Sequence, residues 1–488
     1  MNSIPHFQLD RKTKIIATLG PASNNKITLL AMFKAGVDVI RLNASHEAHP
    51  DVIKAQVKLI RQAAKAAGKS VGIFLDLQGP KIRTGLFKEK KIELKTGATF
   101  VLTSEDILGT AERASVTYAG FAQDVQVGQP LYIDDGKVQL HITAIKGHNV
   151  SCVVKRGGTV SNHKGINLPL TRIRMSALTD KDREDVQLAI DNKLDYIALS
   201  FVSSASDVEE LRSYIGELGS TDIKIISKIE RQFAIDHIIP IIEASDAVMV
   251  ARGDLGVEIG VENVPKTQKM IIRESNRRIK PVIVATQMLE SMIQAETATR
   301  AEVSDVANAV YDGCDAVMLS GETAMGIDPP NVIKTMTTIC LASDRHMMDI
   351  KREDTPEKNV FAQHTTATSF CKAADQIAEE NHAKIIMAFT SSGNTPLIAS
   401  KLNPAMPIIA PTDEEAICCR MSLYRGVMPI LMPKKFRDIH RWNDMIHLAI
   451  KNAKSLGIVD HGDHVVVTAG VPIGQSNGIN SIRIVNVS

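Results

Sequence analysis

Two apolar runs near the middle of the chain end abruptly in charged residues that could perform chemistry together. Residues 224–231 read KIISKIER and carry Lys228 and Glu230, and residues 248–256 read VMVARGDLG and carry Asp254. Because successive side chains of a strand alternate between its two faces, Lys228 and Glu230 would point to the same side. An ammonium beside two carboxylates can hold a phosphate and a divalent cation, although surface ion pairs would explain either segment taken alone.

The segments that must position these groups alternate between strand-like and helix-like patterns. Eight of them have the length and composition of buried strands, and most are followed by a helical stretch: 14–18, 38–42, 71–75, 195–200, 223–229, 246–251, 281–285 and 315–319. Strand–helix alternation indicates parallel strands with crossover helices. Eight units are the count of a (β/α)8 TIM barrel, whose active site lies at the carboxyl ends of the strands.

The alternation is interrupted once and is followed by a further unit. Residues 81–172 contain short alternating runs with turns between them, which predicts an inserted small β-barrel domain placed to act as a lid. Residues 1–80 and 173–345 then make up one discontinuous catalytic barrel. Residues 346–488 read as a C-terminal α/β domain of flavodoxin-like type, whose first residues, 346–359, are expected to form a linker from the barrel.

Composition narrows the class of protein. The 488 residues suggest roughly three domains, and the net charge of +2 gives no reason to expect a nucleic-acid or membrane partner. The six cysteines lack the CxxC spacing of metal sites and read as reduced thiols. The chain shows neither a signal-peptide core nor an apolar run of spanning length, so we expect a cytoplasmic protein.

Nearly every expected strand ends in a polar or charged residue. These residues are Thr18, Arg41, Asn43, Asp76, Ser200, Lys228, Glu230, Asp254, Thr286, Gln287, Ser320 and Glu322. Polar groups placed directly after apolar runs are costly unless they converge on something polar, so we expect them to share one pocket.

The types of these residues fit phosphoryl transfer, in which a protein mainly positions groups and neutralises developing charge. Lys228 and Arg41 are the cations expected beside the moving phosphoryl group. Glu230 and Asp254 offer the hard oxygen ligands that Mg²⁺ or Mn²⁺ prefer. Gly253 removes a side chain where backbone N–H groups could approach a substrate carboxylate.

Other candidates have a simpler structural explanation of similar weight. Thr286, Ser320 and Glu322 could pass a proton to a carbon through water, or could cap helix starts. Lys164, where the lid returns to the barrel, could reach nucleotide phosphates or be solvated. The loop 390–395, TSSGNT, could bind a phosphate at a helix N-terminus or only cap that helix. No GxxxxGK[ST] occurs, so a Walker loop does not hold the nucleotide.

Nine short motifs, in order along almost the whole chain, resemble the pyruvate kinase family, and its potassium-independent bacterial branch in particular. They are TKIIATLGP (13–21), RLNASH (41–46), DLQGPKIR (76–83), IISKIE (225–230), MVARGDLGVEI (249–259), ATQMLESM (285–292), TRAE (299–302), DVANAV (305–310) and MLSGETA (318–324).

This resemblance implies an allosterically regulated homotetramer that transfers phosphate from phosphoenolpyruvate to ADP, giving pyruvate and ATP, the last step of glycolysis. It implies a divalent metal on Glu230 and Asp254, with Lys228 at the transferring phosphoryl, and a carboxylate site at Gly253, Asp254 and Thr286. It places Thr286, Ser320 and Glu322 on the side from which the enolate is protonated. The implied phosphate and nucleotide contacts are Arg41, Asn43, His46, Arg83 and Lys164. The implied site for a phosphorylated effector is Thr390, Ser391, Ser392, Gly393, Asn394 and Thr395.

One departure from the family pattern concerns a monovalent cation. Many members have Thr and Glu where this chain has Leu77 and Lys81, and those members need K⁺ beside Asn43, Ser45 and Asp76. A Lys81 ammonium would supply a permanent charge near that place. We therefore expect activity that does not require K⁺.

Two other functions remain open at this point. One is another metal-dependent barrel enzyme that handles phosphoenolpyruvate or pyruvate, such as a mutase or an aldolase. The other is a catalytically silent metabolite sensor that uses the C-terminal loop. Pyruvate formation that requires ADP would separate the first expectation from both.

Overall fold

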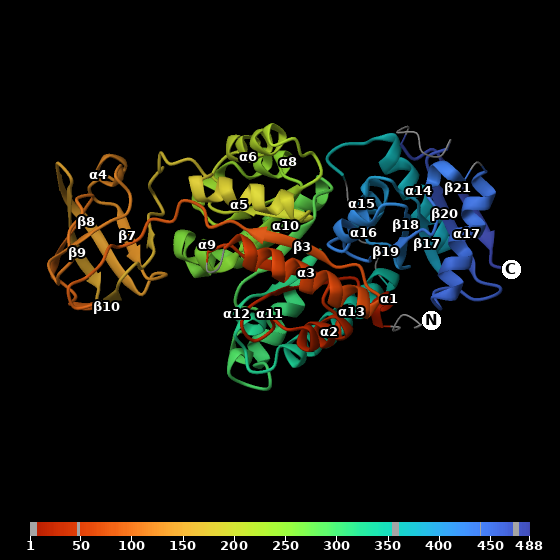
Figure 1. Cartoon of the computed structure of the whole chain (residues 1–488), viewed down its shortest axis with the longest axis horizontal. Helices are drawn as coiled ribbons and strands as arrows, with labels where there is room; N and C mark the ends of the chain where they lie inside the picture. The colour runs from red at the N-terminus through yellow and green to blue at the C-terminus, as the bar shows by residue number, and fades with distance from the viewer. Residues whose placement is uncertain (1–6, 46–48, 354–360, 440, 472–477) are drawn as a thin grey trace.

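The computed structural model describes residues 7–45, 49–353, 361–439, 441–471 and 478–488. Its three parts lie in a row, with an all-β lid at one end, a barrel in the middle and an α/β domain at the other end (Figure 1). In the described residues, we find no helix with both the length and the apolar character needed to cross a membrane.

The central part is a closed ring of eight parallel strands, in the order β1-β16-β15-β14-β13-β12-β3-β2. Its strands are β1 (Lys14–Thr18), β2 (Val39–Asn43), β3 (Gly72–Asp76), β12 (Tyr196–Leu199), β13 (Lys224–Ile229), β14 (Ala247–Ala251), β15 (Val282–Ala285) and β16 (Ala316–Leu319). The predicted barrel is confirmed. Both β2 and β3 end one residue later than expected, so that Asn43 and Asp76 pair as the last residues of neighbouring strands.

Helices surround this ring because each strand is followed by an amphipathic or apolar segment that covers it. Around the barrel lie α1 (Phe7–Asp10), α2 (Lys26–Ala35), α3 (Pro50–Ala67), α5 (Asp180–Asp191), α6 (Ala205–Glu217), α7 (Gln232–Asp236), α8 (Ile238–Ala244), α9 (Arg252–Ile259), η1 (Val261–Asn263), α10 (Val264–Arg277), η2 (Glu290–Ile293), α11 (Arg300–Tyr311), α12 (Gly321–Ala324) and α13 (Pro329–Glu353). Helix α13 continues to Glu353, so the first half of the expected linker 346–359 is helical instead.

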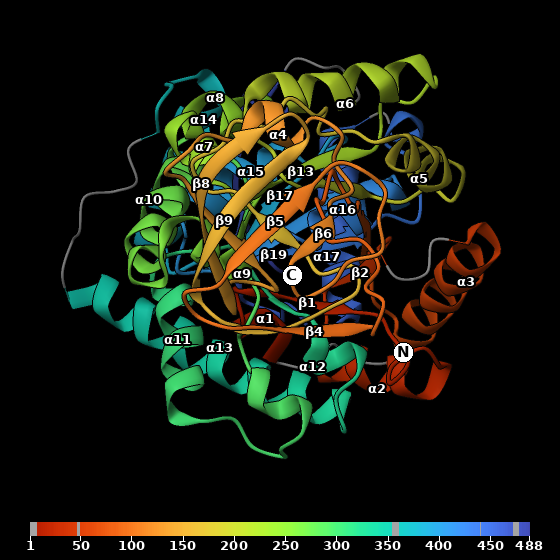
Figure 2. The ribbon, with the colours of Figure 1, turned by 90° about the vertical axis from the view of Figure 1, so that its left-hand side faces the viewer.

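The inserted unit is all β apart from one short helix. Its elements are β4 (Lys91–Leu94), β5 (Thr99–Thr103), β6 (Arg113–Ser115), α4 (Phe121–Asp124), β7 (Pro130–Ile133), β8 (Val138–Lys146), β9 (Asn149–Arg156), β10 (Gly158–Ser161) and β11 (Ile166–Asn167). They form a six-stranded sheet and a two-stranded sheet, so the ladders do not close into one ring, although both sheets share a single apolar core. Figure 2 looks from this side, with the lid strands in front of the barrel.

The C-terminal domain has helices on a five-stranded sheet, β19-β18-β17-β20-β21, in which only β21 is antiparallel to its neighbour. Its elements are α14 (Thr366–Glu380), β17 (Ile385–Ala388), α15 (Asn394–Lys401), β18 (Ile408–Thr412), α16 (Glu415–Met421), β19 (Val427–Leu431), η3 (Phe436–Asp438), α17 (Trp442–Ser455), β20 (His464–Ala469) and β21 (Ser481–Asn486). It is joined to the amino-terminal ends of the barrel strands, for example by the Lys401–Asp315 ion pair just before β16. The carboxyl ends of the strands therefore remain free to face the lid.

Candidate active site

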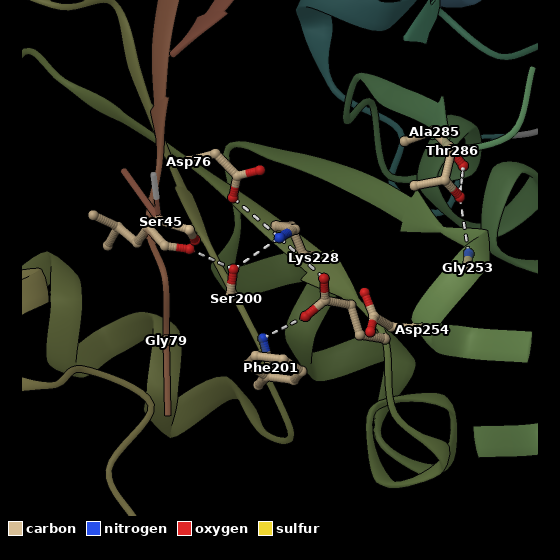
Figure 3. A network of polar contacts seen from close by, with 12 residues as sticks. Ser45, Asp76, Gly79, Ser200, Phe201, Lys228, Gly253, Asp254, Ala285 and Thr286 are labelled. Atoms are coloured by element: carbon tan, nitrogen blue, oxygen red, sulfur yellow. Dashed lines mark hydrogen bonds and ion pairs between the residues drawn. The ribbon is translucent and has the colours of Figure 1, made fainter. Parts of the chain in front are cut away.

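Lys228 is the centre of a polar network at the carboxyl ends of the barrel strands (Figure 3). Its ammonium nitrogen lies 3.0 Å from Asp76 Oδ1 and 3.0 Å from Glu230 Oε1, and it donates to Ser200 Oγ at 2.8 Å. Burial by itself would lower the pKa of Lys228, but the carboxylates of Asp76 and Glu230 outweigh burial and raise that pKa above its usual value. The side chain is therefore a permanent cation held at a defined position.

Arg41 shares the carboxylate of Asp76 with Lys228. Its Nε donates to Asp76 Oδ2 at 2.7 Å, and its Nη1 donates to Thr18 Oγ1 at 3.2 Å. Burial of Asp76 acts to raise its pKa, but Lys228 and Arg41 reverse that effect and keep the pKa below its usual value. Two strand ends thus present two fixed positive charges bridged by one anion.

Glu230 follows the last residue of β13 and is almost fully buried, with 1% of its surface exposed. Besides the ion pair with Lys228, its Oε2 accepts a hydrogen bond of 2.8 Å from the backbone N–H of Phe201. Phe201 has a φ of +56°, in the left-handed region. The carboxylate is therefore held by one side chain and by one unusual stretch of backbone.

Asp254 lies in the first turn of α9, which begins directly after β14. Burial and the nearby charge of Glu230 raise the pKa of Asp254 to about 6, while Lys81 and Lys228 act in the opposite direction. The nearest cation is Lys81, whose Nζ lies 4.0 Å from Asp254 Oδ1. A carboxylate whose proton affinity is raised by a neighbouring carboxylate marks a place where a cation is stabilised.

The residues present fit a divalent cation of the Mg²⁺ or Mn²⁺ type. Within the described residues, His, Cys, Asp and Glu side chains form no group of three or more that could enclose a metal. Glu230 and Asp254 alone are consistent with an ion that keeps water and substrate oxygens among its ligands, as Mg²⁺ usually does.

The loop after β15 provides the opposite wall. Thr286 and Gln287 both have positive φ, +73° and +53°, and Thr286 Oγ1 accepts the backbone N–H of Gly253 at 2.8 Å. Thr286 Oγ1 in turn donates to Ala285 O at 2.6 Å. The N–H of Gly253 is thus paired with a threonine hydroxyl in this structure.

Glu322 is fully buried, with 0% of its surface exposed. Its two carboxylate oxygens accept backbone N–H groups from Ser320 at 2.7 Å and from Leu289 at 3.1 Å. This geometry fixes the loops that carry Thr286 and Ser320.

Comparison with known proteins agrees with this geometry. The model of the pyruvate kinase barrel domain matches residues 10–333, and that of the pyruvate kinase alpha/beta domain matches residues 368–485. The pyruvate kinase of Geobacillus stearothermophilus is 41% identical over 480 residues, which cover 98% of this chain and 80% of the relative. That of Corynebacterium glutamicum is 41% identical over 478 residues, 98% of each chain. The chain belongs to the pyruvate kinase family. It is an enzyme, a phosphotransferase, and the resemblance seen in the motifs is confirmed.

A solved structure supports the same conclusion for the fold. The crystal structure of a pyruvate kinase from Cryptosporidium parvum superposes with a TM-score of 0.91 at 36% identity, over 100% of this chain and 98% of the other. The barrel, the lid and the C-terminal domain are therefore those of a pyruvate kinase.

Four residues were expected to bind a monovalent cation or to supply its charge: Asn43, Ser45, Asp76 and Lys81. Asn43 Oδ1 accepts the N–H of Ser45 at 3.2 Å, and Asn43 pairs with Asp76 across β2 and β3. Among the described residues, the ion pair of Lys81 is with Asp254 instead. Lys81 therefore adds its charge on the side of the carboxylate pair.

The predicted nucleotide contacts lie mostly in the lid. Arg83 donates to His163 O at 3.1 Å, and Lys164 Nζ forms an ion pair of 2.9 Å with Asp134 Oδ1. In the described residues, these contacts stay inside the lid and do not join either cation to Lys228. His46 lies outside the described residues.

The C-terminal loop predicted as an effector site forms a small hollow. Thr390 Oγ1 accepts the N–H of Gly393 at 2.8 Å, and Gly393 has a φ of +89° before helix α15 begins at Asn394. A cavity of about 100 Å³ is lined by Thr390, Ser391, Ser392 and Thr395, together with residues of the facing elements such as Phe436. The loop backbone thus has the form of a helix N-terminus that borders a cavity.

Reasoning from sequence assigned no specific role to two residues that touch the charged groups, Ser200 and Phe201. Ser200 was expected only as a polar strand end, yet it is 1% exposed and bridges Lys228 and Leu77 O. Phe201 gave no signal at all, because an N–H donor with positive φ leaves no mark in side-chain chemistry. Its position next to Ser200, directly after an expected strand, is the feature of the sequence that could have pointed to it.

Proposed function

We propose that this enzyme transfers the phosphoryl group of phosphoenolpyruvate to ADP, giving pyruvate and ATP. The observation that carries the proposal is the ammonium of Lys228, fixed between Asp76, Glu230 and Ser200 beside the second carboxylate of Asp254. Phosphoryl transfer needs fixed positive charge and a cation site in one place, and this network provides both.

In this proposal the cations and the carboxylates of the site have separate roles. Lys228 and Arg41 hold the phosphoryl group and neutralise its charge as its bond to the enol oxygen of phosphoenolpyruvate breaks and its bond to an oxygen of ADP forms. Glu230 and Asp254 would hold Mg²⁺ or Mn²⁺, which when bound neutralises charge on the substrate oxygens. The substrate carboxylate would take the place at Gly253 and Asp254, where Thr286 Oγ1 now accepts the Gly253 N–H.

The proton that converts the enolate to pyruvate would arrive from the side of Thr286 and Ser320. Thr286 would give its hydroxyl proton to the enolate carbon and take one from water in exchange, once its O–H turned away from Ala285 O, so that no charge would remain on the hydroxyl. Glu322 would support this step by holding the backbone of Ser320, since its carboxylate has no exposed surface.

The nucleotide would bind between the barrel and the lid, with Asn43, His46, Arg83 and Lys164 as its contacts. Lys164 would exchange its ion pair with Asp134 for nucleotide phosphates, which requires the lid to move toward the barrel. A Lys164→Met variant that keeps the KM for ADP would argue against this assignment.

We further propose that the enzyme needs no K⁺. Lys81 stands where many relatives carry Glu, and it brings a permanent charge to within 4.0 Å of Asp254. Replacing K⁺ by a bulky organic cation at constant ionic strength is expected to leave turnover unchanged. A several-fold loss would contradict the proposal, and Lys81→Glu would be expected to create a K⁺ requirement.

The loop Thr390–Thr395 is proposed to bind a phosphorylated effector of a homotetramer. Its support is the hollow beside the N-terminus of α15 and the hydroxyls around it. Activity measured with sugar phosphates and nucleoside monophosphates, in the native chain and in Thr390→Ala, tests this site. Sedimentation of the native chain tests the tetramer.

The decisive test of the reaction is pyruvate formation from phosphoenolpyruvate, followed by a coupled assay. Pyruvate must form with ADP and a divalent cation and must not form when ADP is left out. Formation of pyruvate without ADP would favour another phosphoenolpyruvate enzyme. No formation of pyruvate, with ADP or without it, would favour a silent sensor.

A further inference from the structure

The residue that follows Glu230 in the chain contacts the backbone donor that holds Glu230. Arg231 stands at the N-cap position of α7, and its guanidinium carbon lies 5.1 Å from the centroid of the Phe201 ring. The N–H of Phe201 is the group that donates to Glu230 Oε2 at 2.8 Å. Arg231 can therefore influence that carboxylate through one intervening residue.

Phe201 needs support from its surroundings because its backbone is strained. Its φ of +56° lies in a region that residues with a Cβ rarely adopt. The turn at Gly79 packs closely against it, since a Cβ at Gly79 would lie 2.9 Å from Phe201 Cδ2. Arg231 stacks on the same ring. Together the turn and the guanidinium fix the ring and, with it, the direction of the N–H.

The ring of Phe201 is a close contact of the Arg231 guanidinium. Among the described residues, Arg231 takes part in no ion pair within 4.0 Å, although carboxylates led by Glu258 and Glu230 surround it at longer range. A partly buried guanidinium that lacks a close carboxylate gains more from an aromatic face than a fully exposed one does. Stacking on Phe201 is thus the contact through which Arg231 acts.

Arg231 also borders the connection between lid and barrel. A small cavity is lined by Phe201, Arg231 and Glu258 together with both segments that join the lid to the barrel, 80–82 and 166–168. Asn167, the last residue of β11, lines this cavity together with Glu258. The group that supports Phe201 is therefore in the same small space as the base of the lid.

We propose that Arg231 is a positioning residue for the divalent cation, because it fixes Phe201 and through Phe201 the carboxylate of Glu230. This inference rests on the proposed function in one respect, since it takes Glu230 as a metal ligand. Residues that orient metal ligands typically change metal affinity by about 10- to 100-fold when they are replaced. Arg231 acts one residue further away, so we expect the lower end of that range.

The test is a titration of the protein with Mn²⁺, with free Mn²⁺ measured by electron paramagnetic resonance in the absence of substrates. Arg231→Met is expected to weaken Mn²⁺ binding about tenfold, and Arg231→Lys to restore part of the loss. The matched control is Arg183→Met, which removes a guanidinium 4.7 Å from the ring of Tyr214, on the outside of the barrel. That variant should bind Mn²⁺ like the native chain.

Two further variants separate the routes. Phe201→Gly keeps an N–H with positive φ but removes the ring, so it should lose about as much Mn²⁺ affinity as Arg231→Met. The double variant should lose no more than either single one, because both changes break the same chain of contacts. Additive losses, or an Arg231→Met variant with native Mn²⁺ affinity and native Tm, would overturn the inference.

Glu230→Gln in the same titration distinguishes this inference from the proposed function. If Glu230→Gln weakens Mn²⁺ binding and Arg231→Met does not, only the role of Arg231 is wrong. If Glu230→Gln leaves Mn²⁺ binding unchanged, the metal assignment itself fails and the inference fails with it.

Discussion

Lys14 and Lys228 are buried lysines at opposite ends of the same barrel, and their surroundings shift their pKa values in opposite directions. Lys14 begins β1 and donates to Val427 O of the C-terminal domain at 2.7 Å. Burial lowers the pKa of Lys14 to about 8, and the cations Arg11 and Lys69 act in the same direction, so that the carboxylates of Asp38 and Asp344 do not offset them. Lys228 faces two carboxylates, which outweigh burial and raise its pKa. Two carboxylates raise the pKa of each lysine, but those of Lys228 lie 3.0 Å from its ammonium, whereas Asp38 and Asp344 form no ion pair within 4.0 Å with Lys14.

The two ends of the barrel also differ in how far their charged side chains are exposed to solvent. At the amino-terminal end, the pairs Lys401–Asp315 and Arg425–Asp344 are closed to solvent, with side-chain exposures of 3% and 0% and of 6% and 0%. At the carboxyl end, Asp254 is still 29% exposed. The first end joins two domains, and the second leaves its charges available to a ligand.

The largest expected effect is at Lys228. Lys228→Met should lower turnover by a factor on the order of 10³ or more, because the cation that neutralises the moving phosphoryl group is lost. Lys14→Met removes the buried ammonium at the other end and should keep turnover. Steady-state assays of both variants, with circular dichroism to confirm folding, check the contrast. Equal losses in the two variants would remove it.

Asp344→Asn tests the closed end. Asp344 accepts hydrogen bonds from the N–H groups of Lys12 and Thr13 and pairs with Arg425 at 2.6 Å. Leaving that guanidinium buried without its carboxylate should cost about 3–5 kcal/mol. Asp10→Asn breaks the exposed pair with Arg345 and should cost at most about 1 kcal/mol. Chemical denaturation followed at the barrel–domain junction measures both, and similar costs would contradict the distinction.

Asp76→Asn tests whether the open end depends on a shared anion. Arg41 would lose its charged partner and Lys228 one of its two, so we expect kcat/KM to fall about 10- to 100-fold. The pH profile of kcat/KM should also shift toward lower pH on its basic side, because Asp76 would no longer raise the pKa of Lys228. A variant with a native profile would show that Glu230 alone maintains the charge of Lys228.

The smallest effect concerns pH and Lys14. The folded-state pKa of about 8 lies below the unfolded value of 10.5, so the buried charge destabilises the native state below pH 8. Stability should therefore rise as pH increases from 8 toward 10.5, since the unfolded chain then binds more protons. Relative to Lys14→Met, the native chain should gain about 1 kcal/mol between pH 7 and pH 9. Thermal denaturation of both proteins at the two pH values measures the gain, and a constant difference in Tm would disprove it.

The sequence by itself determined the barrel and most of its charged rim. Apolar runs of strand length that stop in Arg41, Asp76 and Lys228 can be counted from the text, and parallel strands must present their carboxyl ends together. The same rule explains why Glu230 and Asp254 were expected as neighbours. Motifs in order then pointed to the family, which the comparisons confirm.

Only the tertiary structure decided which of these groups contact one another. The structure pairs Lys81 with Asp254, a contact that a long side chain at the base of the lid can make and that the sequence does not record. Glu322 turned out to hold backbone N–H groups, and Phe201 to donate one from a left-handed conformation. Backbone direction and the partner of a flexible ammonium depend on residues far away in the chain, so no local pattern records them.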